Sequence, residues 1–430
     1  MASLSTRCNE AAHLSDSLTH WKIVQDLWDP DTNPSGFVNL GIAENSLMHD
    51  TLSHHIHQNI SLPKTAFTYG DGTVGSERLR EAVARFLTKH FKPARPLTRS
   101  HISITNGCNS SIEQLSWACA NPGEAFLLGQ PHWGTFVPDL SLRFGTRLLP
   151  VPFHDVDPLG DGCVQKYEDV ILGAYSRGEK VAGLVICNPH NPLGRCYSRE
   201  TLVCLLQLCE KYQIHFISDE IYALSVWSNT IDDNIPPPNL FVSVLSIDPQ
   251  GLIDPARIHI VWGLSKDFGA SGLRVGSIVS QSNETLHKAM TPSGLYTYVS
   301  AASDHIAANI LEDMTFTDEY IAENRKRLGK QYEHVVRWTK AQGISHAPGV
   351  NAAFFIWLDL GSYYRRYHPE TDIQDLPGKV TQELLGKKVF LASGKDFGAE
   401  KPGWFRIVFA HEDYYLHEGL GRIAAALGGA

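Results

Sequence analysis

The 430-residue sequence has no run of about 18 consecutive apolar residues, the length that a membrane-spanning helix requires. Its first ten residues, MASLSTRCNE, lack the apolar centre of a secretory signal. It also lacks an excess of positive charge, because 37 Lys and Arg stand against 46 Asp and Glu, a net charge of -9. These absences predict a protein that inserts in no membrane and binds neither nucleic acid nor anionic lipid through general charge attraction.

The eight cysteines form no C-x-x-C pair, and several lie in apolar runs such as Val203–Cys209. This distribution favours reduced, mostly buried thiols and therefore a cytoplasmic protein. Metal-ligand patterns are scarce as well. His54, His55 and His57 form a short tract, but no Cys or carboxylate stands at ligand spacing from it, and histidines on a polar helix are usually solvated. The sequence predicts no metal site.

Hydrophobic residues make up 43% of the chain and charged residues 19%, which excludes disorder and coiled coil. Three short apolar runs, Val181–Cys187, Ile214–Ser218 and Ile258–Trp262, have the length and continuity of strands buried on both faces of a parallel sheet. Between the first two, apolar residues at i, i+3, i+4 and i+7 follow Ser198, a helix-capping residue type. The segment is therefore a predicted βαβ unit.

The pattern changes after about residue 290 to the long amphipathic stretch Asp318–Lys340 and to the strand-like segments Ala352–Leu360 and Trp404–Phe409. We therefore expect an α/β protein in which a large domain, with a mostly parallel sheet flanked by helices, is joined to a smaller α+β domain. The expected boundaries are 46–292 for the large domain, and 1–45 with 293–430 for the small one.

Each of the three predicted strands ends where unusual polar residues begin: Asn188–Gly194, Asp219–Tyr222 and Gly263–Lys266. In open α/β sheets the ligand crevice lies beyond the carboxyl ends of the strands, so these turns should converge. A lone lysine is usually a solvated charge. Lys266, however, follows a buried strand and stands eight residues before Arg274. An amine can form a Schiff base with a cofactor aldehyde and an arginine can hold a phosphate, which together indicate pyridoxal phosphate.

Each of the other polar residues near these turns has two interpretations. Asp219 either caps the following segment or keeps a pyridine nitrogen protonated, and Tyr222 is placed to reach the ring hydroxyl. Asn191 belongs either to a turn of Asn, Pro and Gly or to the same hydroxyl contact. Residues Asn106–Ser111 stand at the start of an amphipathic segment. They either only cap a helix, or form a helix N-terminus whose backbone N–H groups bind phosphate.

Taken together, these segments resemble the fold-type I pyridoxal-phosphate enzymes of the aspartate aminotransferase superfamily over roughly residues 37 to 410. The motifs that carry the resemblance are Asn106–Ser111, Trp133, Asn191–Gly194, Asp219–Tyr222, Ser265–Lys266, Arg274 and Arg406. The resemblance implies the cofactor pyridoxal 5′-phosphate and three catalytic residues. Lys266 would hold the cofactor and shuttle protons, Asp219 would pair with the pyridine nitrogen, and Tyr222 would contact the ring hydroxyl.

The resemblance also implies a set of cofactor contacts: Tyr69, Gly107, Cys108, Asn109, Trp133, Asn191, Asp219, Tyr222, Ser265, Lys266 and Arg274. Arg406 would clamp the α-carboxylate of a small amino-acid substrate. Tyr69 would reach the cofactor of the neighbouring subunit, which makes the expected protein a homodimer with a shared site.

Within the superfamily, Asn39–Leu47 is similar to a segment of the 1-aminocyclopropane-1-carboxylate synthases and their relatives. In that group the acid of the segment helps to select a sulfonium substrate, so Ala43 and Glu44 are expected at the substrate. The implied reaction is α-proton abstraction and γ-elimination or cyclisation of S-adenosylmethionine or a related amino acid. A transaminase that forms a 2-oxo acid and a carbon–sulfur lyase remain alternatives, and a solvated Glu44 is the plain alternative for that residue.

Three positions depart from the family pattern. Gly263 stands where a phosphate-binding serine is frequent, so that contact is missing or is made by Ser265. Tyr69 lies six residues before Gly75 instead of about five, and Trp133 replaces the tyrosine that the synthases tend to have. The motif G-x-G-x-x-G at Gly70–Gly75 lacks the preceding strand and later acid of a dinucleotide site, and we interpret it as a turn near the dimer contact.

Overall fold

The computed structural model describes residues 4–17, 20–232 and 238–428. Within these ranges no helix combines the length and the apolarity needed to cross a membrane. Five of the eight cysteines are buried and none of the eight is in a disulfide, as the sequence predicts.

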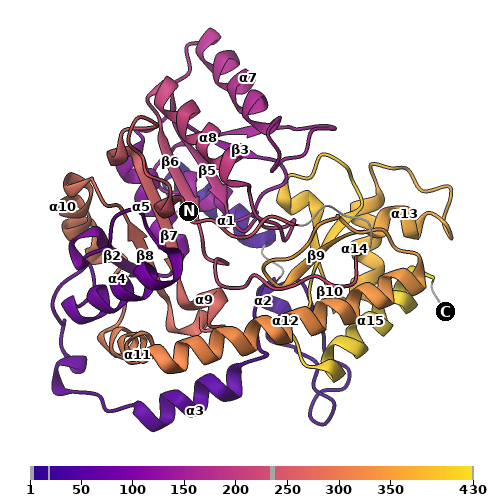
Figure 1. The fold of residues 1–430 in the computed structure, drawn as a ribbon. Helices are drawn as coiled ribbons and strands as arrows, with labels where there is room; N and C mark the ends of the chain where they lie inside the picture. The colour runs from indigo at the N-terminus through magenta and orange to yellow at the C-terminus, as the bar shows by residue number, and fades with distance from the viewer. Residues whose placement is uncertain (1–3, 18–19, 233–237, 429–430) are drawn as a thin grey trace.

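A seven-stranded mixed sheet forms the centre of the larger part of the molecule, with helices packed around it (Figure 1). Its strands, in spatial order, are β2 (Ile102–Asn106), β8 (Val275–Val279), β7 (Ile258–Gly263), β6 (His215–Asp219), β5 (Val181–Cys187), β3 (Ala125–Gly129) and β4 (Arg147–Val151). The five strands from β7 to β4 are mutually parallel, and β8 runs antiparallel to both of its neighbours. The predicted mostly parallel sheet is confirmed.

The three predicted strands are β5, β6 and β7, and β5 and β7 are buried at every position because both faces of the sheet are covered. The predicted βαβ helix is α8 (Arg199–Tyr212). Ser198 caps it by accepting a hydrogen bond from the backbone N–H of Thr201 at 3.0 Å. Its apolar stripe is fully buried against the sheet.

The remaining helices that accompany this sheet are α3 (His49–Asn59), α4 (Glu77–Phe91), α5 (Cys108–Cys119), α6 (Phe136–Ser141), α7 (Cys163–Ser176), α9 (Leu264–Asp267), α10 (Glu284–Ser293) and α11 (Ala301–Glu312). The prediction that the three histidines of α3 are solvated is wrong for His55. His54 and His57 are exposed, but His55 is buried and stacks on Phe316 with 3.6 Å between ring centroids, because it faces inward while its neighbours face water.

The C-terminal part contains an antiparallel sheet of three strands, ordered β11 (Ala392–Ser393), β12 (Trp404–Val408) and β9 (Phe355–Asp359). The N-terminal strand β1 (Val38–Asn39) pairs in parallel with β10 (Val389–Phe390), which places this strand beside the C-terminal part. The helices here are α12 (Met314–Gln342), α13 (Leu360–Tyr364), α14 (Leu376–Gly386) and α15 (Asp413–Leu427). The exact domain boundaries stay a prediction.

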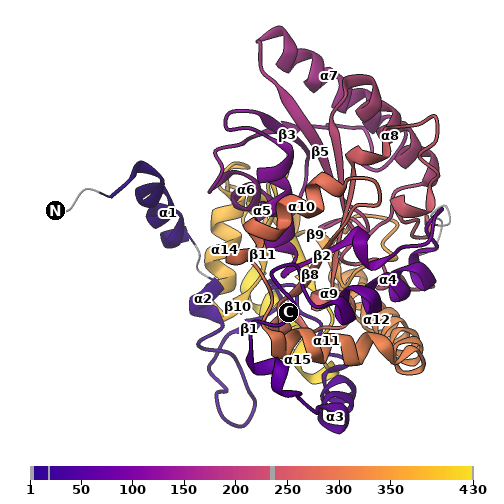
Figure 2. The ribbon, with the colours of Figure 1, turned by 90° about the vertical axis from the view of Figure 1, so that its left-hand side faces the viewer.

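The first helices lie at one side of the molecule. α1 (Thr6–Ser17) stands apart from the body of the chain, whereas α2 (His20–Ile23) lies close to it (Figure 2). One hydrogen bond of α1 to the body is that of the Arg7 guanidinium to the carbonyl of Arg143, at 3.5 Å.

Candidate active site

The predicted turns converge on one pocket at the carboxyl ends of β5, β6 and β7, with about 440 Å³ of empty volume. Its lining residues are Cys108, Asn109, Ile112, Trp133, Phe136, Asp139, Cys187, Asn191, Asp219, Ile221, Tyr222 and Lys266. Most of the predicted cofactor residues therefore lie together. Gly107 and Ser265 directly precede lining residues in the chain and Arg274 lies beside Gly107, whereas Tyr69 lines a different pocket.

Lys266 lies on α9, directly after β7, and its Nζ donates a hydrogen bond to the carbonyl oxygen of Ala43 at 2.5 Å. Burial and, to a smaller extent, the positive charge of Arg406 lower the pKa of Lys266 to about 8, while the charge of Glu44 acts in the opposite direction. A substantial part of the amine is therefore neutral and nucleophilic near pH 8, which an ordinary lysine is not.

Asp219 is the last residue of β6 and is only 7% exposed. It accepts a hydrogen bond from the backbone N–H of Ile221 at 3.3 Å, and no basic side chain forms an ion pair with it in the part of the chain that is described. Burial raises its pKa to about 7. A carboxyl group placed in this way gains most from a cationic N–H partner supplied by a ligand.

Arg406 projects from β12 and is fully buried. Its Nη1 donates to Asn191 Oδ1 at 2.9 Å and its Nη2 to the carbonyl of Gly41 at 2.6 Å, but its Nε has no partner. The amide of Asn191 also lies 3.5 Å from the hydroxyl of Tyr222. Burial lowers the pKa of Arg406 to about 10, which still leaves it charged at neutral pH.

Three aromatic rings surround the guanidinium of Arg406, with its Cζ 5.1 Å from the Trp133 centroid, 5.1 Å from that of Phe355 and 4.9 Å from that of Phe397. Cation–π attraction compensates part of the desolvation of the charge, but the described residues provide no carboxylate for it. A buried arginine that retains an unpaired N–H fits a bound carboxylate.

Close backbone packing shapes the other end of the pocket. Gly107 has φ = 80° and directly precedes α5, and a Cβ on Gly276 would lie 2.5 Å from the carbonyl carbon of Gly107. A Cβ on Gly263 would lie 2.5 Å from the carbonyl oxygen of Val275 and 3.0 Å from Cys108 Sγ. A serine cannot occupy position 263 without displacing this backbone, which explains the departure from the family pattern.

Arg274 lies beside this turn, and its guanidinium donates to the carbonyls of Ser271 at 3.0 Å and Asn106 at 3.3 Å. The first backbone N–H groups of α5, from Cys108 onward, have no partner within the helix and, together with Arg274, suit an anion. Ser265 is buried directly before Lys266. The side chain of Asn109 is turned away and donates to Asp139 at 2.7 Å, so only its backbone is free for an anion.

Sequence reasoning missed two acids, the partly buried Asp139 and the buried Asp267. Asp139 lines the pocket, and burial raises its pKa to about 7. Asp267 follows Lys266 and accepts hydrogen bonds from Leu224 N at 3.1 Å, Trp262 Nε1 at 3.1 Å and Ser225 Oγ at 2.8 Å. Asp267 thereby fixes the short helix that carries the lysine. Its position next to Lys266 was the only available signal, and Asp139 had none.

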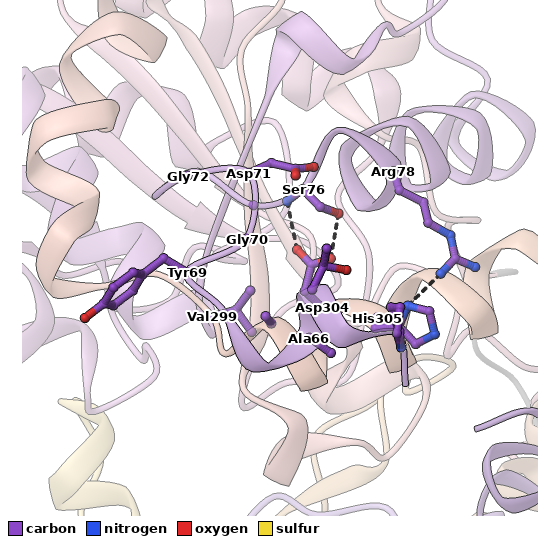
Figure 3. Close-up of a pocket in the computed structure, with 14 residues that line it drawn as sticks. Ala66, Tyr69, Gly70, Asp71, Gly72, Ser76, Arg78, Val299, Asp304 and His305 are labelled. Carbon is purple, nitrogen blue, oxygen red and sulfur yellow. Dashed lines mark hydrogen bonds between the residues drawn. The ribbon is translucent and has the colours of Figure 1, made fainter. Parts of the chain in front are cut away.

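Glu44 is exposed near the pocket, where its carboxylate accepts a hydrogen bond from Ser271 Oγ at 3.4 Å. Tyr69 lies elsewhere, in a separate pocket with the glycine turn and Asp304, and it is 87% exposed (Figure 3). Its ring points away from the other labelled residues. The glycine turn leads to Ser76, whose hydroxyl donates to Asp304 at 2.6 Å, and then to α4.

Residues 35–423 match the family described as "Aminotransferase class I and II". The chain is 35% identical over 413 residues to 1-aminocyclopropane-1-carboxylate synthase-like protein 1 of Bos taurus, covering 94% of this chain and 78% of that protein. It is 32% identical over 414 residues to the probable aminotransferase sirI of Leptosphaeria maculans, covering 94% and 95%. The fold is similar to that of aspartate aminotransferase from Thermus thermophilus with maleate, with a TM-score of 0.74, 20% identity and coverage of 99% and 100%.

Fold, turn geometry and donor set together define an enzyme of the fold-type I pyridoxal-phosphate class. The chain belongs to the aminotransferase class I and II family. Its residues fit the cofactor of that family. They provide the amine of Lys266 with a lowered pKa, the buried carboxyl group of Asp219 without an ion-pair partner, and a helix N-terminus packed against glycines beside Arg274. The roles of the individual residues stay predictions.

The lowered pKa of Lys266 predicts how the cofactor-free protein reacts with pyridoxal phosphate. Because only the neutral amine attacks an aldehyde, the rate constant should rise about tenfold per pH unit and level off above about pH 8. Stopped-flow absorbance measures this profile. In Arg406→Met the profile should shift to higher pH, because a positive charge is removed. Lys266→Ala should keep its circular dichroism spectrum but lose both covalent attachment and turnover, and a rate that still rises at pH 10 would contradict the assignment.

The buried guanidinium predicts the effect of Arg406→Lys. A compact ammonium cannot reproduce the two-pronged contact, so kcat/KM for every α-amino acid substrate should fall by a factor on the order of 10². The cofactor spectrum should stay nearly unchanged. Arg422→Lys is a matched control, because Arg422 pairs with Glu418 away from the pocket. An unchanged kcat/KM in Arg406→Lys would show that the substrate carboxylate is held elsewhere.

Proposed function

We propose that the protein acts on S-adenosylmethionine or a related amino acid by removing the α-proton and expelling a γ-leaving group, with or without ring closure. The observation that carries this proposal is the position of residues 41–44 against the pocket. The carbonyl of Gly41 accepts from Arg406, the carbonyl of Ala43 accepts from Lys266, and the charge of Glu44 acts on the Lys266 amine. The segment similar to that of the synthases therefore borders the groups expected to bind substrate.

Charge complementarity supports the choice of substrate. Glu44 is an exposed acid at this border, and among the described residues its carboxylate accepts a hydrogen bond only from Ser271, at 3.4 Å. A sulfonium group carries a positive charge that a nearby carboxylate stabilises. The name of the relative in Bos taurus, a synthase-like protein, agrees with this choice.

Bound pyridoxal phosphate supplies an electron sink for the carbanion that forms when the α-proton leaves. In this proposal Arg406 binds the substrate carboxylate and so fixes which α-bond faces the lysine. With the cofactor bound, Asp219 would hold the proton of the pyridine nitrogen. Lys266 would accept the α-proton at Nζ, which its lowered pKa and its position favour. Tyr222 and Asn191 would contact the ring hydroxyl.

A transaminase is the second candidate, because the same lysine, aspartate and arginine serve it equally. Trp133 favours it, because the synthases tend to have tyrosine at this position, and the ring lines the pocket 5.1 Å from the Arg406 guanidinium. The relative in Leptosphaeria maculans, a probable aminotransferase, matches over nearly its whole length. Product identification separates the candidates: methylthioadenosine from S-adenosylmethionine supports the first, and glutamate from an amino acid with 2-oxoglutarate supports the second.

The proposed role of Glu44 predicts a selective loss in Glu44→Gln. KM for S-adenosylmethionine should rise by about tenfold, because an attraction between opposite charges is lost, while KM for neutral amino acids stays constant. Asp50→Asn removes an exposed acid from α3 and should change neither value. Steady-state kinetics with both substrates decides the matter, and an equal change for neutral and cationic substrates would exclude charge recognition by Glu44.

We also propose that two copies form a homodimer in which Tyr69 completes the partner's site. Support comes from its exposed ring and from its absence from the pocket of its own chain. Lys266→Ala and Tyr69→Ala homodimers should both have low activity. Hybrid dimers of the two variants contain one intact site, so activity should return to as much as about half of the wild-type value. Hybrids that form, as mass spectrometry would show, but stay inactive would refute the shared site.

A further inference from the structure

A second group of chemically reactive side chains lies at the end of the sheet opposite the pocket. His215 is the first residue of β6, whose last residue is Asp219, and His259 is the second residue of β7, which ends at Gly263. Cys119 is the last residue of α5, which begins at Cys108 beside the pocket. The three elements that form the active site at one end thus bring two imidazoles and a thiol together at the other.

The strand register explains why these side chains meet. Ile217 is paired with His259, and His215 precedes Ile217 by two residues, so the two imidazoles share one face of the sheet. Helix α5 packs against β7 and β8 and ends near this pair. Cys119 Sγ and one nitrogen of each imidazole all lie within 4.8 Å of one another.

We propose that Cys119, His215 and His259 form a binding site for a thiophilic transition-metal ion of the zinc class. His215 Nδ1 and His259 Nε2 are 3.0 Å apart. Two imidazole nitrogens on one tetrahedral zinc ion lie about 3.3 Å apart, so the pair needs to open by only a few tenths of an ångström. The sulfur must come within about 3.6 Å of each nitrogen, which requires a shift of about 1 Å. A water molecule would complete the coordination.

The surroundings of His259 suit a metal ligand. Its Nδ1 lies 3.2 Å from Ser280 Oγ, and that hydroxyl lies 3.4 Å from the carbonyl of Ile258. If Nδ1 carries the proton and donates it to Ser280, then Nε2 is left with a free lone pair for the metal. His215 then moves its proton to Nε2. The thiol of Cys119 releases its proton to solvent, so one proton is released per ion bound.

The charges around the site do not oppose a cation. Burial lowers the pKa of both His215 and His259, which favours the neutral rings that coordinate a metal, whereas burial raises the pKa of the Cys119 thiol, so that a bound cation has to offset the cost of forming the thiolate. The positive charge of Arg257 acts on His215, but this guanidinium is paired with Glu210 at 3.0 Å. Cys119 ends a helix, and the negative end of the helix dipole favours a cation there.

This site would connect the end of α5 to two strands of the central sheet. Since the first residues of the same helix form one wall of the pocket, a metal ion here would fix the orientation of α5 from its far end. The inference concerns binding and stability and is independent of the reaction proposed above.

The test uses the purified holoenzyme, treated with a chelator and then titrated with Co²⁺. We expect one ion per chain by equilibrium dialysis with elemental analysis, and visible d–d bands of a tetrahedral site with a thiolate ligand. Zn²⁺ should displace Co²⁺ and raise the melting temperature. Cys119→Ser removes a partly buried thiol with little change in volume, and it should abolish these bands and the Zn²⁺-dependent rise. Ser280→Ala should weaken binding by about tenfold.

Cys204→Ser is the matched control, because Cys204 is an exposed thiol on α8 away from the site. It should bind Co²⁺ like the wild type. The inference is wrong if the wild-type chain binds no Co²⁺ at stoichiometric concentration, or if Cys119→Ser binds it unchanged. Equal losses in Cys119→Ser and Cys204→Ser would likewise show that binding is unspecific.

Discussion

The burial of the Arg406 guanidinium without a carboxylate partner is the constraint on which the arrangement of the site depends. A charge removed from water is costly, and here the carbonyl of Gly41, the amide of Asn191 and three aromatic rings offset the cost only in part. These groups come from five separate positions along the chain, at residues 41, 133, 191, 355 and 397. The site therefore retains a local excess of positive charge that a bound carboxylate neutralises.

The same positive charge influences the chemistry of the lysine. Arg406 disfavours the protonated form of Lys266, and burial of the amine acts in the same direction. A substrate carboxylate that neutralises Arg406 would remove part of this effect and raise the pKa of Lys266. Substrate binding and the basicity of the proton acceptor are then coupled, and the amine becomes a stronger base when there is an α-proton to remove.

Features that depend on local sequence were predictable. The strands around Val181 and Ile258 and the helix after Ser198 follow from periodicity and capping, and each predicted turn lies where a strand ends. Contacts between distant segments were not predictable in the same way. The inward orientation of His55, the Asn109 to Asp139 hydrogen bond and the meeting of Cys119 with His259 depend on packing that no short motif encodes.

The antiparallel direction of β8 affects how the reaction and substrate of such a site can change. Because β7 and β8 are adjacent and opposed, Lys266 and Arg274 lie on the single connection between them. Two of the groups that would hold the cofactor therefore belong to one short stretch of chain, and they stay together when other parts of the sequence change. Ala43 and Arg406 lie on separate segments, one near each terminus. The substrate side can therefore change through substitutions outside the stretch that carries Lys266 and Arg274, so one scaffold can serve several reactions.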